Sequence, residues 1–461
     1  MLGAARRSGW AMKIAIIGAG WAGMAAAVEA TAGGHRVSLF EASRMLGGRA
    51  RSVQGQLPDG SPVVLDNGQH ILIGAYSQTL QLMRQVGVNE HQALLRLPMT
   101  LRFPDACGVQ FPRWPAPLDA LAGIVSARGW RLIDKWSLLR LAGRWQQQKF
   151  QCGAELSVAQ LCRGLSPRVI NELIQPLCLS ALNTAIEEAS AQVFLRIIQD
   201  ALLGETGSSH LLLPRVDLSK LFPHAAARWL TQHGAEMHLG KRIDTLTHHG
   251  GQWVVANQRF DAVILATSTM QSVQLLEHSA ADLPTSIATS IAPWTQVCHG
   301  LRFAAICTVY AWGANAALTR PMLALRSKTS DGTPAPAQFV FDRSQLGGPD
   351  GLLAFVVSAS DQEREILQAQ VLRQAHTQLG LKLQAVQTIV ERRATFACTP
   401  ALLRPAQKIA AGLLACGDYV AGPYPATLEG AVRSAVSAAR AVALDVYDVK
   451  STNDTNKESN L

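Results

Sequence analysis

The sequence predicts an α/β fold in which a parallel sheet covered by helices is interleaved with a second part made of a mixed sheet and further helices. Three observations predict it. A short apolar run near the N-terminus is followed by a glycine loop and an Ala-rich stretch. Strand-like runs of the same kind return in the middle of the chain and near its C-terminus. A length of 461 residues exceeds what one compact core usually holds, so two domains are expected.

The first element is a strand followed by a glycine loop. Residues 13–17 have the pattern of a buried strand, and residues 21–32 that of the next helix. The loop Gly18-Ala-Gly20-Trp-Ala-Gly23 lies between them. Gly18 allows a tight turn, Gly20 lets the backbone approach a pyrophosphate, and Gly23 lets the helix pack closely on the strand. The helix N-terminus then faces the negative charge, which predicts a dinucleotide site.

Two further cues follow a second strand at residues 35–40. Glu41 can accept hydrogen bonds from both ribose hydroxyls and disfavours a 2′-phosphate. The turn Gly47-Gly48 with Arg49 would place N–H groups and a guanidinium beside the same diphosphate. An ordinary Gly-rich loop would leave this second cluster unexplained. Flavin enzymes of the two-dinucleotide-binding-motif type carry it, whereas nicotinamide enzymes usually lack it, so a Rossmann-like FAD-binding domain of that type is predicted.

The middle of the chain predicts a helical insertion and then a return to the nucleotide domain. Helices are expected at 77–86, within 117–148, within 157–203 and at 222–233. Strands are expected at 234–239, 242–248, 252–256 and 259–266.

The last third predicts a substrate-binding sheet and the other half of the cofactor site. Strand patterns at 306–312, 339–341 and 352–358 with a helix at 361–379 indicate an antiparallel sheet. A strand at 412–418 ends in Gly417-Asp418, and a helix follows at 431–446. An Asp at that place can bond a ribityl hydroxyl, and the helix N-terminus can face the pyrimidine end of a flavin. An ordinary Gly-Asp turn is the alternative, but the cluster at 47–49 favours a flavin.

These elements predict a discontinuous organisation. The FAD-binding domain would comprise residues 12–75, 215–285 and 405–446. The substrate-binding domain would comprise residues 76–214 and 286–404. Residues 1–11 and 447–461 are expected to be flexible termini, with Met12 as the natural start and no signal peptide.

The composition indicates which kinds of ligand and partner are expected. Hydrophobic residues reach 48% and charged residues only 16%, so a large apolar cavity is expected. The net charge of +9 comes without an RNA- or DNA-binding signature, which argues against nucleic acid. The charge is concentrated at 111–149, where seven basic residues outnumber two acidic ones among four Trp. Peripheral contact with an anionic membrane surface and a solvated basic face over a core both explain this segment.

Eight cysteines are scattered without a CxxC or a zinc-site spacing. They indicate reduced, mostly buried thiols in a cytoplasmic protein, and no metal site is expected. The nearest candidate for a membrane span, 303–319, is better explained as a strand and a loop.

Several segments carry a resemblance to a known family. Gly18–Gly23, Glu41-Ala-Ser-Arg-Met-Leu-Gly-Gly-Arg-Ala50, Asp66-Asn-Gly-Gln-His70, Cys416-Gly-Asp418 and Pro425–Ala431 resemble the flavin amine oxidase and phytoene desaturase superfamily. Within it, the chain from Met12 to about Leu444 is most similar to the squalene-associated FAD enzymes, the hydroxysqualene dehydroxylases of hopanoid biosynthesis. That narrower assignment rests on Trp21 in the glycine loop, the turn at 66–70 and the stretch at 213–219.

The resemblance implies a set of cofactor-binding residues. The glycines of the first loop would line the FAD diphosphate, Glu41 would hold the adenosine ribose, and the backbone of Ile243 would meet adenine. Arg49 with Gly47 and Gly48 would flank diphosphate and flavin. The complete set is Gly18, Gly20, Trp21, Ala22, Gly23, Glu41, Ala42, Gly47, Gly48, Arg49, Ile243, Gly417, Asp418, Ala426 and Thr427. Ala266-Thr267-Ser268 departs from the usual continuation of its strand, and we expect these residues mainly to pack.

The implied reaction is reductive dehydroxylation of hydroxysqualene to squalene. Protonation and loss of the allylic hydroxyl would leave a delocalised cation that accepts hydride from reduced FAD. His70 is a candidate acid, or orients one, although a His satisfied by the backbone of its turn is the favoured alternative. An oxidative phytoene-type desaturase and a non-catalytic prenyl-lipid escort are competing interpretations; an amine oxidase is disfavoured because no paired-aromatic motif stands out near the C-terminus. The synthases that produce hydroxysqualene are candidate partners.

Overall fold

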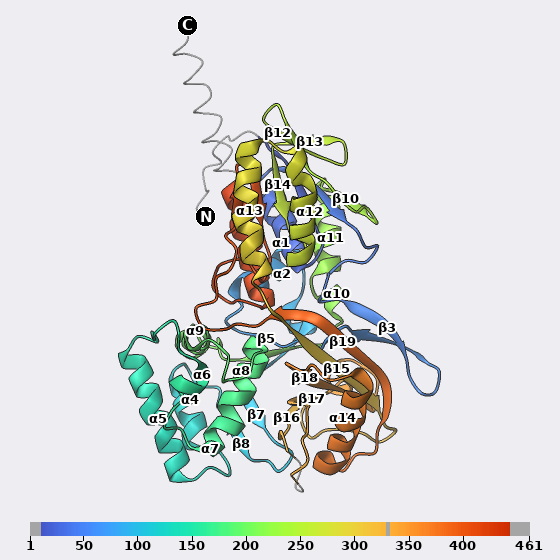
Figure 1. Ribbon diagram of the computed structural model, residues 1–461. Helices are drawn as coiled ribbons and strands as arrows, with labels where there is room; N and C mark the ends of the chain where they lie inside the picture. Colours follow the sequence, from blue (N-terminus) through green and yellow to red (C-terminus); the bar gives the residue numbers. More distant parts are fainter. Residues whose placement is uncertain (1–10, 329–331, 443–461) are drawn as a thin grey trace, which may run out of the picture.

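The computed structural model describes residues 11–328 and 332–442, and the predicted flexible termini lie almost entirely outside these ranges. The molecule is elongated, with a six-stranded sheet in its upper part and a five-stranded sheet beside a group of helices in its lower part (Figure 1). The chain passes between the two parts several times. A division of the chain into the two domains defined above stays a prediction.

The six-stranded sheet brings three distant parts of the sequence together. Its order is β10-β2-β1-β14-β21-β20, with neighbours parallel except for the pair β20 and β21. The strands are β1 (Lys13–Ile17), β2 (Arg36–Glu41), β10 (Glu236–Leu239), β14 (Ala262–Leu265), β20 (Lys408–Ala410) and β21 (Leu413–Ala415). Because parallel strands end at the same edge, the residues that follow β1, β2, β14 and β21 meet there.

Helices cover both faces of this sheet. Ile14 and Ile16 of β1 pack with α1 (Trp21–Ala32), α11 (Pro223–Gln232) and a C-terminal helix at 428–442. Ala15 and Ile17 face the other way, toward α12 (Thr269–Ser279) and α13 (Thr285–His299), which stand in front of β14 in Figure 1. The continuous apolar runs in β1 and β14 follow from burial on both faces.

A small antiparallel sheet connects β10 to β14. It contains β11 (Thr247–His249), β12 (Gln252–Val255) and β13 (Gln258–Phe260). The prediction of a strand at 242–248 is correct only for its last residues, 247 and 248, which belong to β11. Residues 241–246 do not form a strand, because no neighbouring strand pairs with them. The predicted strand at 259–266 is two strands. Asp261 lies between them, where its carboxylate accepts a hydrogen bond from the Lys13 N–H.

The five-stranded sheet is antiparallel and has the order β16-β17-β18-β15-β19. Its strands are β15 (Phe303–Trp312), β16 (Met322–Ala324), β17 (Phe339–Asp342), β18 (Leu352–Ser358) and β19 (Gln384–Phe396). Helix α14 (Arg364–Leu379) packs on one face. β19 was not predicted, because this edge strand carries Gln, Glu and Arg side chains that mask the alternation of a half-buried strand.

The predicted helical insertion is present, and short strands lie before it and within it. Its longer helices are α2 (Ser77–Gln85), α4 (Leu118–Val125), α5 (Leu132–Gln147), α8 (Gln175–Leu182) and α9 (Ala191–Leu203), and its shorter ones α3 (Glu90–Ala93), α6 (Val158–Leu161) and α7 (Pro167–Val169), the last running into a π-helical turn at Ile170–Ile174. α10 (Leu218–Leu221) precedes α11, and 3-10 turns lie at Ala280–Asp282 and Ser344–Leu346. The short strands are β3 (Ser52–Gln56), β4 (Pro62–Asp66), β5 (Leu72–Ile73), β6 (Leu94–Leu97), β7 (Thr100–Arg102), β8 (Gly108–Gln110) and β9 (Leu211–Pro214).

The structure also shows the state of the cysteines and the character of the helices. All eight cysteines are free thiols, and six of them are buried. Within the described residues, no helix combines the length and the apolar character that crossing a bilayer requires.

Candidate functional site

The first glycine loop connects β1 to α1. Gly18 has a φ of +107°, and its N–H donates to the Phe40 carbonyl at 2.7 Å. A Cβ on Gly23 would stand 1.8 Å from the Gly18 oxygen, so this position holds helix against strand. A Cβ on Gly20 would meet nothing closer than the Gly48 Cα at 3.8 Å. Gly23 is thus required by packing, whereas Gly20 keeps the helix N-terminus open to a ligand.

The second glycine loop lies directly against the first. Gly47 pairs with Gly20 in a parallel bridge, and its N–H donates to the Ala19 carbonyl at 2.9 Å. The Trp21 indole N–H donates to the Ala50 carbonyl at 2.9 Å, which joins the start of α1 to the end of the second loop. Trp21 therefore has a structural role in addition to lining the cavity described below. The two loops form one continuous edge of backbone.

The Glu41 side chain binds the backbone of the first glycine loop. One carboxylate oxygen accepts the Ala19 N–H at 2.7 Å, and the other accepts the Ser43 N–H at 2.8 Å. Each oxygen keeps a lone pair that a ribose hydroxyl could use. Ala42 lies beside it on the cavity wall.

The segment after β10 lies next to Glu41. The Lys241 N–H donates to the Glu41 carbonyl at 2.8 Å, and the Gly240 N–H donates to the Ser43 carbonyl at 3.0 Å. These bonds bring Ile243 to the cavity wall although it does not lie in a strand. Residues 41–43 and 241–244 thus form the end of the cavity where an adenosine would fit.

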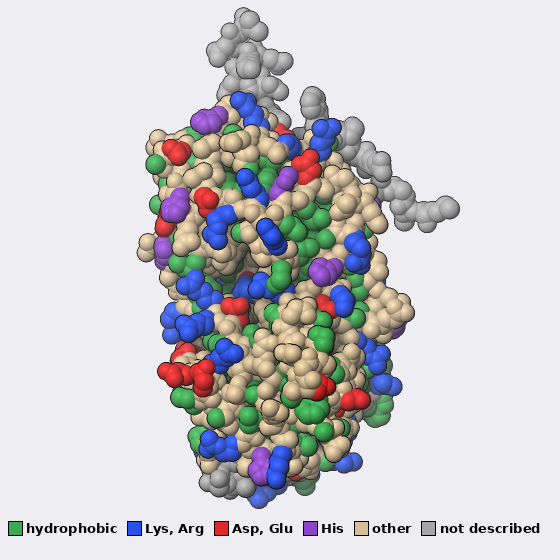
Figure 2. Space-filling view, turned by 90° about the vertical axis from the view of Figure 1, so that its right-hand side faces the viewer, with side chains coloured by type: hydrophobic (Ala, Val, Ile, Leu, Met, Phe, Trp, Pro, Cys, Tyr) green, Lys and Arg blue, Asp and Glu red, His purple; other side chains and the backbone are tan. Residues whose placement is uncertain are grey.

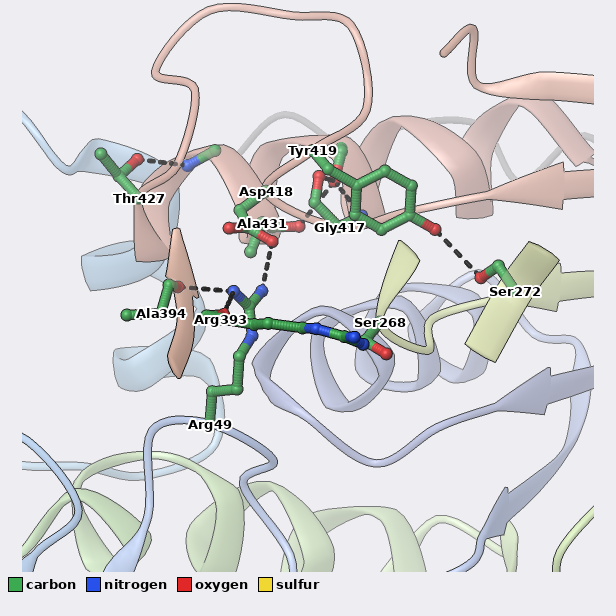
Figure 3. Close-up of polar contacts among 12 residues, drawn as sticks. Arg49, Ser268, Ser272, Arg393, Ala394, Gly417, Asp418, Tyr419, Thr427 and Ala431 are labelled. Atoms are coloured by element: carbon green, nitrogen blue, oxygen red, sulfur yellow. Dashed lines mark hydrogen bonds and ion pairs between the residues drawn. The ribbon is translucent and has the colours of Figure 1, made fainter. Parts of the chain in front are cut away.

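Arg49 joins three segments that are far apart in the sequence (Figure 3). Its guanidinium donates to the Asp418 carboxylate and, at 2.6 Å, to the Ala394 carbonyl at the end of β19. The Arg49 main-chain carbonyl accepts from the Asn67 side-chain amide. The nearby Asp418 carboxylate raises the pKa of Arg49 above its ordinary value, which secures the positive charge. Arg49 is held here by protein groups on both sides, so it fixes the shape of the site as well as its charge.

Gly417 and Asp418 lie where β21 ends, opposite the N-terminus of the helix at 428–442. The Gly417 N–H donates to the Ser434 hydroxyl at 2.9 Å, and the Ala426 N–H donates to the Asp418 carbonyl at 3.1 Å. The Thr427 hydroxyl accepts the Gly430 N–H at 3.0 Å and so caps the helix. Ala426 and Thr427 line the cavity, so the positive end of this helix dipole faces it.

One cavity runs past every predicted cofactor residue except Gly23, which packs against Gly18, and continues deep into the lower part of the molecule. Its volume is about 1260 Å³, above the roughly 300–1,000 Å³ of an ordinary small-molecule pocket. The dinucleotide end is polar and charged, and its wall carries both basic and acidic side chains: Arg49, Lys241, Arg242 and Arg393, and Glu41, Asp244, Glu391 and Asp418. Figure 2 shows Lys and Arg side chains around a hollow at mid-height of the face that carries β3 and β10.

The other end of the cavity is apolar. Its wall comes from α4, α5, α8 and α9 on one side and from β15, β17 and β18 on the other. Phe303, Ile306 and Phe341 point into it from the sheet face opposite α14. A long hydrocarbon could therefore lie there while its reacting end meets a bound cofactor.

These features fit a flavin dinucleotide. The open space at Gly20, the adjoining second loop and the helix N-termini at 21 and 428 supply N–H groups and positive charge for a diphosphate. Asp418 supplies a carboxylate beside Arg49 in the same cavity.

His70 takes part in a tight turn. Its Nδ1 lies 2.7 Å from the Gly68 carbonyl oxygen, so Nδ1 carries the proton. Burial, and to a smaller degree the charge of Arg49, lowers the pKa of His70 below its ordinary value. The ring is therefore neutral at pH 7. This geometry favours the alternative of a His satisfied by its own turn, and a role as acid stays a prediction.

Sequence reasoning missed several residues of the cavity wall. Tyr76 and Tyr424 form an edge-on aromatic pair 6.2 Å apart, and both line the cavity. They were missed because 348 residues separate them in sequence. Thr267 and Ser268 were expected mainly to pack, but they line the cavity because β14 ends at its rim. No role was predicted for Asn67 beyond its place in the turn at 66–70. Its side-chain amide N–H donates to the Arg49 carbonyl, and its side-chain oxygen accepts the Arg51 N–H.

Comparison with known proteins agrees with this geometry. Residues 21–443 match the sequence profile of a family described as "Flavin containing amine oxidoreductase". The chain belongs to this family. Membership confirms the predicted enzyme class, an FAD-dependent oxidoreductase.

Similar proteins extend over almost the whole chain. A hydroxysqualene dehydroxylase of Sinorhizobium fredii is 27% identical over 450 residues, which cover 92% of this chain and 96% of that protein. One of Rhodopseudomonas palustris is 28% identical with the same coverage. A zeta-carotene desaturase of Synechocystis is 40% identical, but over only 18% of this chain and 16% of that protein. The resemblance stated above is confirmed.

Solved structures share the fold. An oxidoreductase from Methanosarcina mazei superimposes with a TM-score of 0.68 at 16% identity and covers 92% of this chain and 99% of that one. A putative protoporphyrinogen oxidase from Exiguobacterium reaches 0.65 at 18% identity, with 95% and 100% coverage. The predicted fold class is confirmed.

Proposed function

We propose that this protein reduces hydroxysqualene to squalene in hopanoid or triterpene biosynthesis. The observation that carries the proposal is the similarity to hydroxysqualene dehydroxylases over 92% of the chain. The zeta-carotene desaturases of Synechocystis and Zea mays match 18% and 27% of the chain. Similarity limited to so small a part of the chain gives no support for a phytoene-type substrate.

The cavity suits the reactants. When bound, reduced FAD supplies a hydride, and the substrate carbon that loses its hydroxyl accepts it. The protein binds the hydrocarbon chain along the apolar walls of α4, α5, α8 and α9. These walls exclude water, which would otherwise recapture an allylic cation. Overall, the substrate C–O bond breaks, a C–H bond forms, and the hydroxyl leaves with a proton as water.

The proton for the leaving hydroxyl requires a donor on the cavity wall. Tyr424 lines the cavity, and its hydroxyl donates to the Asp200 carboxylate at 2.6 Å. Burial raises the pKa of Tyr424, so the phenol keeps its proton at neutral pH. Asp200 is partly exposed and also accepts from Arg196 at 2.8 Å. Within the proposal, Asp200 orients the Tyr424 phenol, which passes its proton to the substrate oxygen and regains a proton from solvent.

The decisive test is anaerobic incubation of the flavin-loaded protein with hydroxysqualene and excess dithionite, followed by extraction and mass analysis. Squalene should form only with reduced flavin, and oxidised flavin serves as the matched control. No squalene together with dehydrogenation of a phytoene-type substrate by oxidised flavin would overturn the proposal. A protein that stays colourless after reconstitution would instead support a lipid escort.

The cellular setting follows from the substrate. The proposed substrate is a lipid, so the protein would work on the cytoplasmic side of the cell membrane as a peripheral protein. The synthases that produce hydroxysqualene would be its suppliers. Co-purification of the tagged protein with such a synthase from gently lysed cells would support this partnership.

A further inference from the structure

An unusual apolar surface lies on α4, on the start of α5 and on the chain before them. Trp114, Leu118, Leu121, Val125, Leu132, Ile133 and Trp136 are between 47% and 84% exposed. They make up seven of the thirteen large exposed hydrophobic residues among those the structure describes. We call this group the α4–α5 patch. In Figure 1 it lies at the lower left, away from the face shown in Figure 2. Such clustering marks an interaction surface, because single exposed hydrophobic residues are normally scattered.

The two helices present their apolar side chains together. Leu118, Leu121 and Val125 follow a spacing of three and four residues, which places them on one face of α4. Leu132, Ile133 and Trp136 do the same in the first turns of α5. The Lys135 ammonium donates to the Val125 carbonyl at 2.6 Å, so the end of α4 lies beside the start of α5. The patch is therefore one continuous surface.

Within residues 111–149, which carry the patch, the exposed charge has a single sign. Arg128, Arg131, Arg140, Arg144 and Lys149 are exposed. Both acidic residues of the segment are buried: Asp119 accepts from Ser209, and Asp134 accepts from the Arg131 N–H. Apolar side chains bordered by exposed cations alone match the apolar interior and anionic headgroups of a lipid leaflet. A second protein copy would bring the same cations face to face and be repelled.

The patch also borders the cavity. Leu118 and Leu121 line the cavity, although 55% and 47% of each is exposed. Leu203, at the end of α9, is 43% exposed and lines the cavity as well. Side chains that belong both to the wall and to the surface mark an opening, and this opening lies within the α4–α5 patch.

We propose that the α4–α5 patch inserts into an anionic lipid leaflet and that the lipid substrate enters the cavity between α4, α5 and the end of α9 directly from that leaflet. The identity of the substrate rests on the proposed function; membrane insertion does not. Entry from the leaflet spares a long hydrocarbon the free-energy cost of crossing water.

The test compares two double variants of the flavin-loaded protein. L132S/I133S alters the patch at side chains that do not line the cavity. I366S/L403S, at residues 48% and 76% exposed outside the patch, is the matched control. Binding is measured by flotation with vesicles of phosphatidylcholine containing 30% phosphatidylglycerol. Turnover is measured with substrate embedded in those vesicles and, separately, dissolved in detergent.

We expect the wild type and I366S/L403S to bind the anionic vesicles equally, and L132S/I133S to bind at least tenfold more weakly. Turnover by L132S/I133S should fall to a similar degree with vesicle-embedded substrate and stay unchanged in detergent. R140Q/R144Q should weaken binding to anionic vesicles roughly 25-fold, at about fivefold for each cation, with little change on neutral vesicles.

Three results would overturn the proposal. Equal vesicle binding by L132S/I133S would show that the patch does not insert. Lost binding with unchanged turnover of vesicle-embedded substrate would show that the substrate enters elsewhere. A lipid-free dimer that L132S/I133S converts to a monomer would assign the patch to a second copy. If the wild type did not turn over the detergent-dissolved substrate, the proposed function would be refuted instead. The vesicle-binding measurements would then still test membrane insertion.

Discussion

Replacement of Gly20 by Ala separates cofactor binding from folding more cleanly than any other change in the first loop. Gly20 has φ −71° and ψ −178°, an extended backbone that alanine adopts without strain. Its added methyl would meet only the Gly48 Cα at 3.8 Å, an ordinary van der Waals contact. The free energy of unfolding of the flavin-free protein should therefore stay within about 0.5 kcal/mol of wild type.

The effect on the cofactor should be much larger. The methyl would occupy the space between the two glycine loops, where the diphosphate has to approach the N-terminus of α1. Losing one or two charge-assisted hydrogen bonds costs about 2–4 kcal/mol. That corresponds to a dissociation constant for FAD raised about 30- to 1,000-fold.

Gly23→Ala is the matched opposite. Its methyl would stand 1.8 Å from the Gly18 oxygen, so the backbone of strand or helix must shift. We expect a loss of about 3 kcal/mol or more in the unfolding free energy. Urea denaturation of the flavin-free proteins and calorimetric titration with FAD measure both quantities. A Gly20→Ala protein destabilised by more than about 2 kcal/mol, or one that binds FAD within threefold of wild type, would refute the reasoning.

Three further variants test other parts of the site. The lysine of Arg49→Lys cannot bond Asp418 and Ala394 at the same time. Urea denaturation should therefore show an unfolding free energy about 1–2 kcal/mol lower than that of wild type, and flavin titration should show weaker binding. Wild-type values in both measurements would contradict the bridging role of Arg49. Burial raises the pKa of Asp66 to about 6, so the stability from its bound proton is present below about pH 4 and lost as the pH rises to 6. The unfolding free energy of Asp66→Asn should therefore rise relative to that of wild type by about 2–3 kcal/mol between pH 4 and 7. A difference that does not change with pH would argue against this reasoning. His70→Ala should keep single-turnover squalene formation within about threefold, because the neutral ring hydrogen bonds to its own turn; a hundredfold loss would restore His70 as the acid.

Local pattern predicted the parts of the fold whose cause is local. The loop at 18–23, the acid at 41 and the loop at 47–49 lie within one βαβ unit, where spacing alone fixes their relative places. Helices and buried strands with clear periodicity were also predicted, with ends shifted by a few residues. β19 and the strand predicted at 242–248 show the limit: pairing partners decide what forms a strand, and those partners lie elsewhere in the chain.

The cofactor site divides in the same way. Gly417 and Asp418 could be suspected from a strand that ends in Gly-Asp, but their contact with Arg49 depends on the order of the parallel sheet. Tyr76 and Tyr424 carry no motif and meet only because the helix at 428–442 and α2 pack on the same core. The basic, Trp-rich segment left two interpretations open. The structure buries Trp130 and Trp145 and exposes Trp114 and Trp136.

The sequence by itself determined the cofactor class, because a diphosphate needs open backbone, a helix N-terminus and a ribose-binding acid at fixed local distances. It also determined the chemical character of the chain, rich in apolar residues with one basic segment. Only the tertiary structure decided that the two glycine loops and Asp418 share one cavity, which side chains line its apolar end, and that two of them, Leu118 and Leu121, also belong to the exposed α4–α5 patch. These properties depend on contacts between residues hundreds of positions apart, which strand order and helix packing create and no local pattern records.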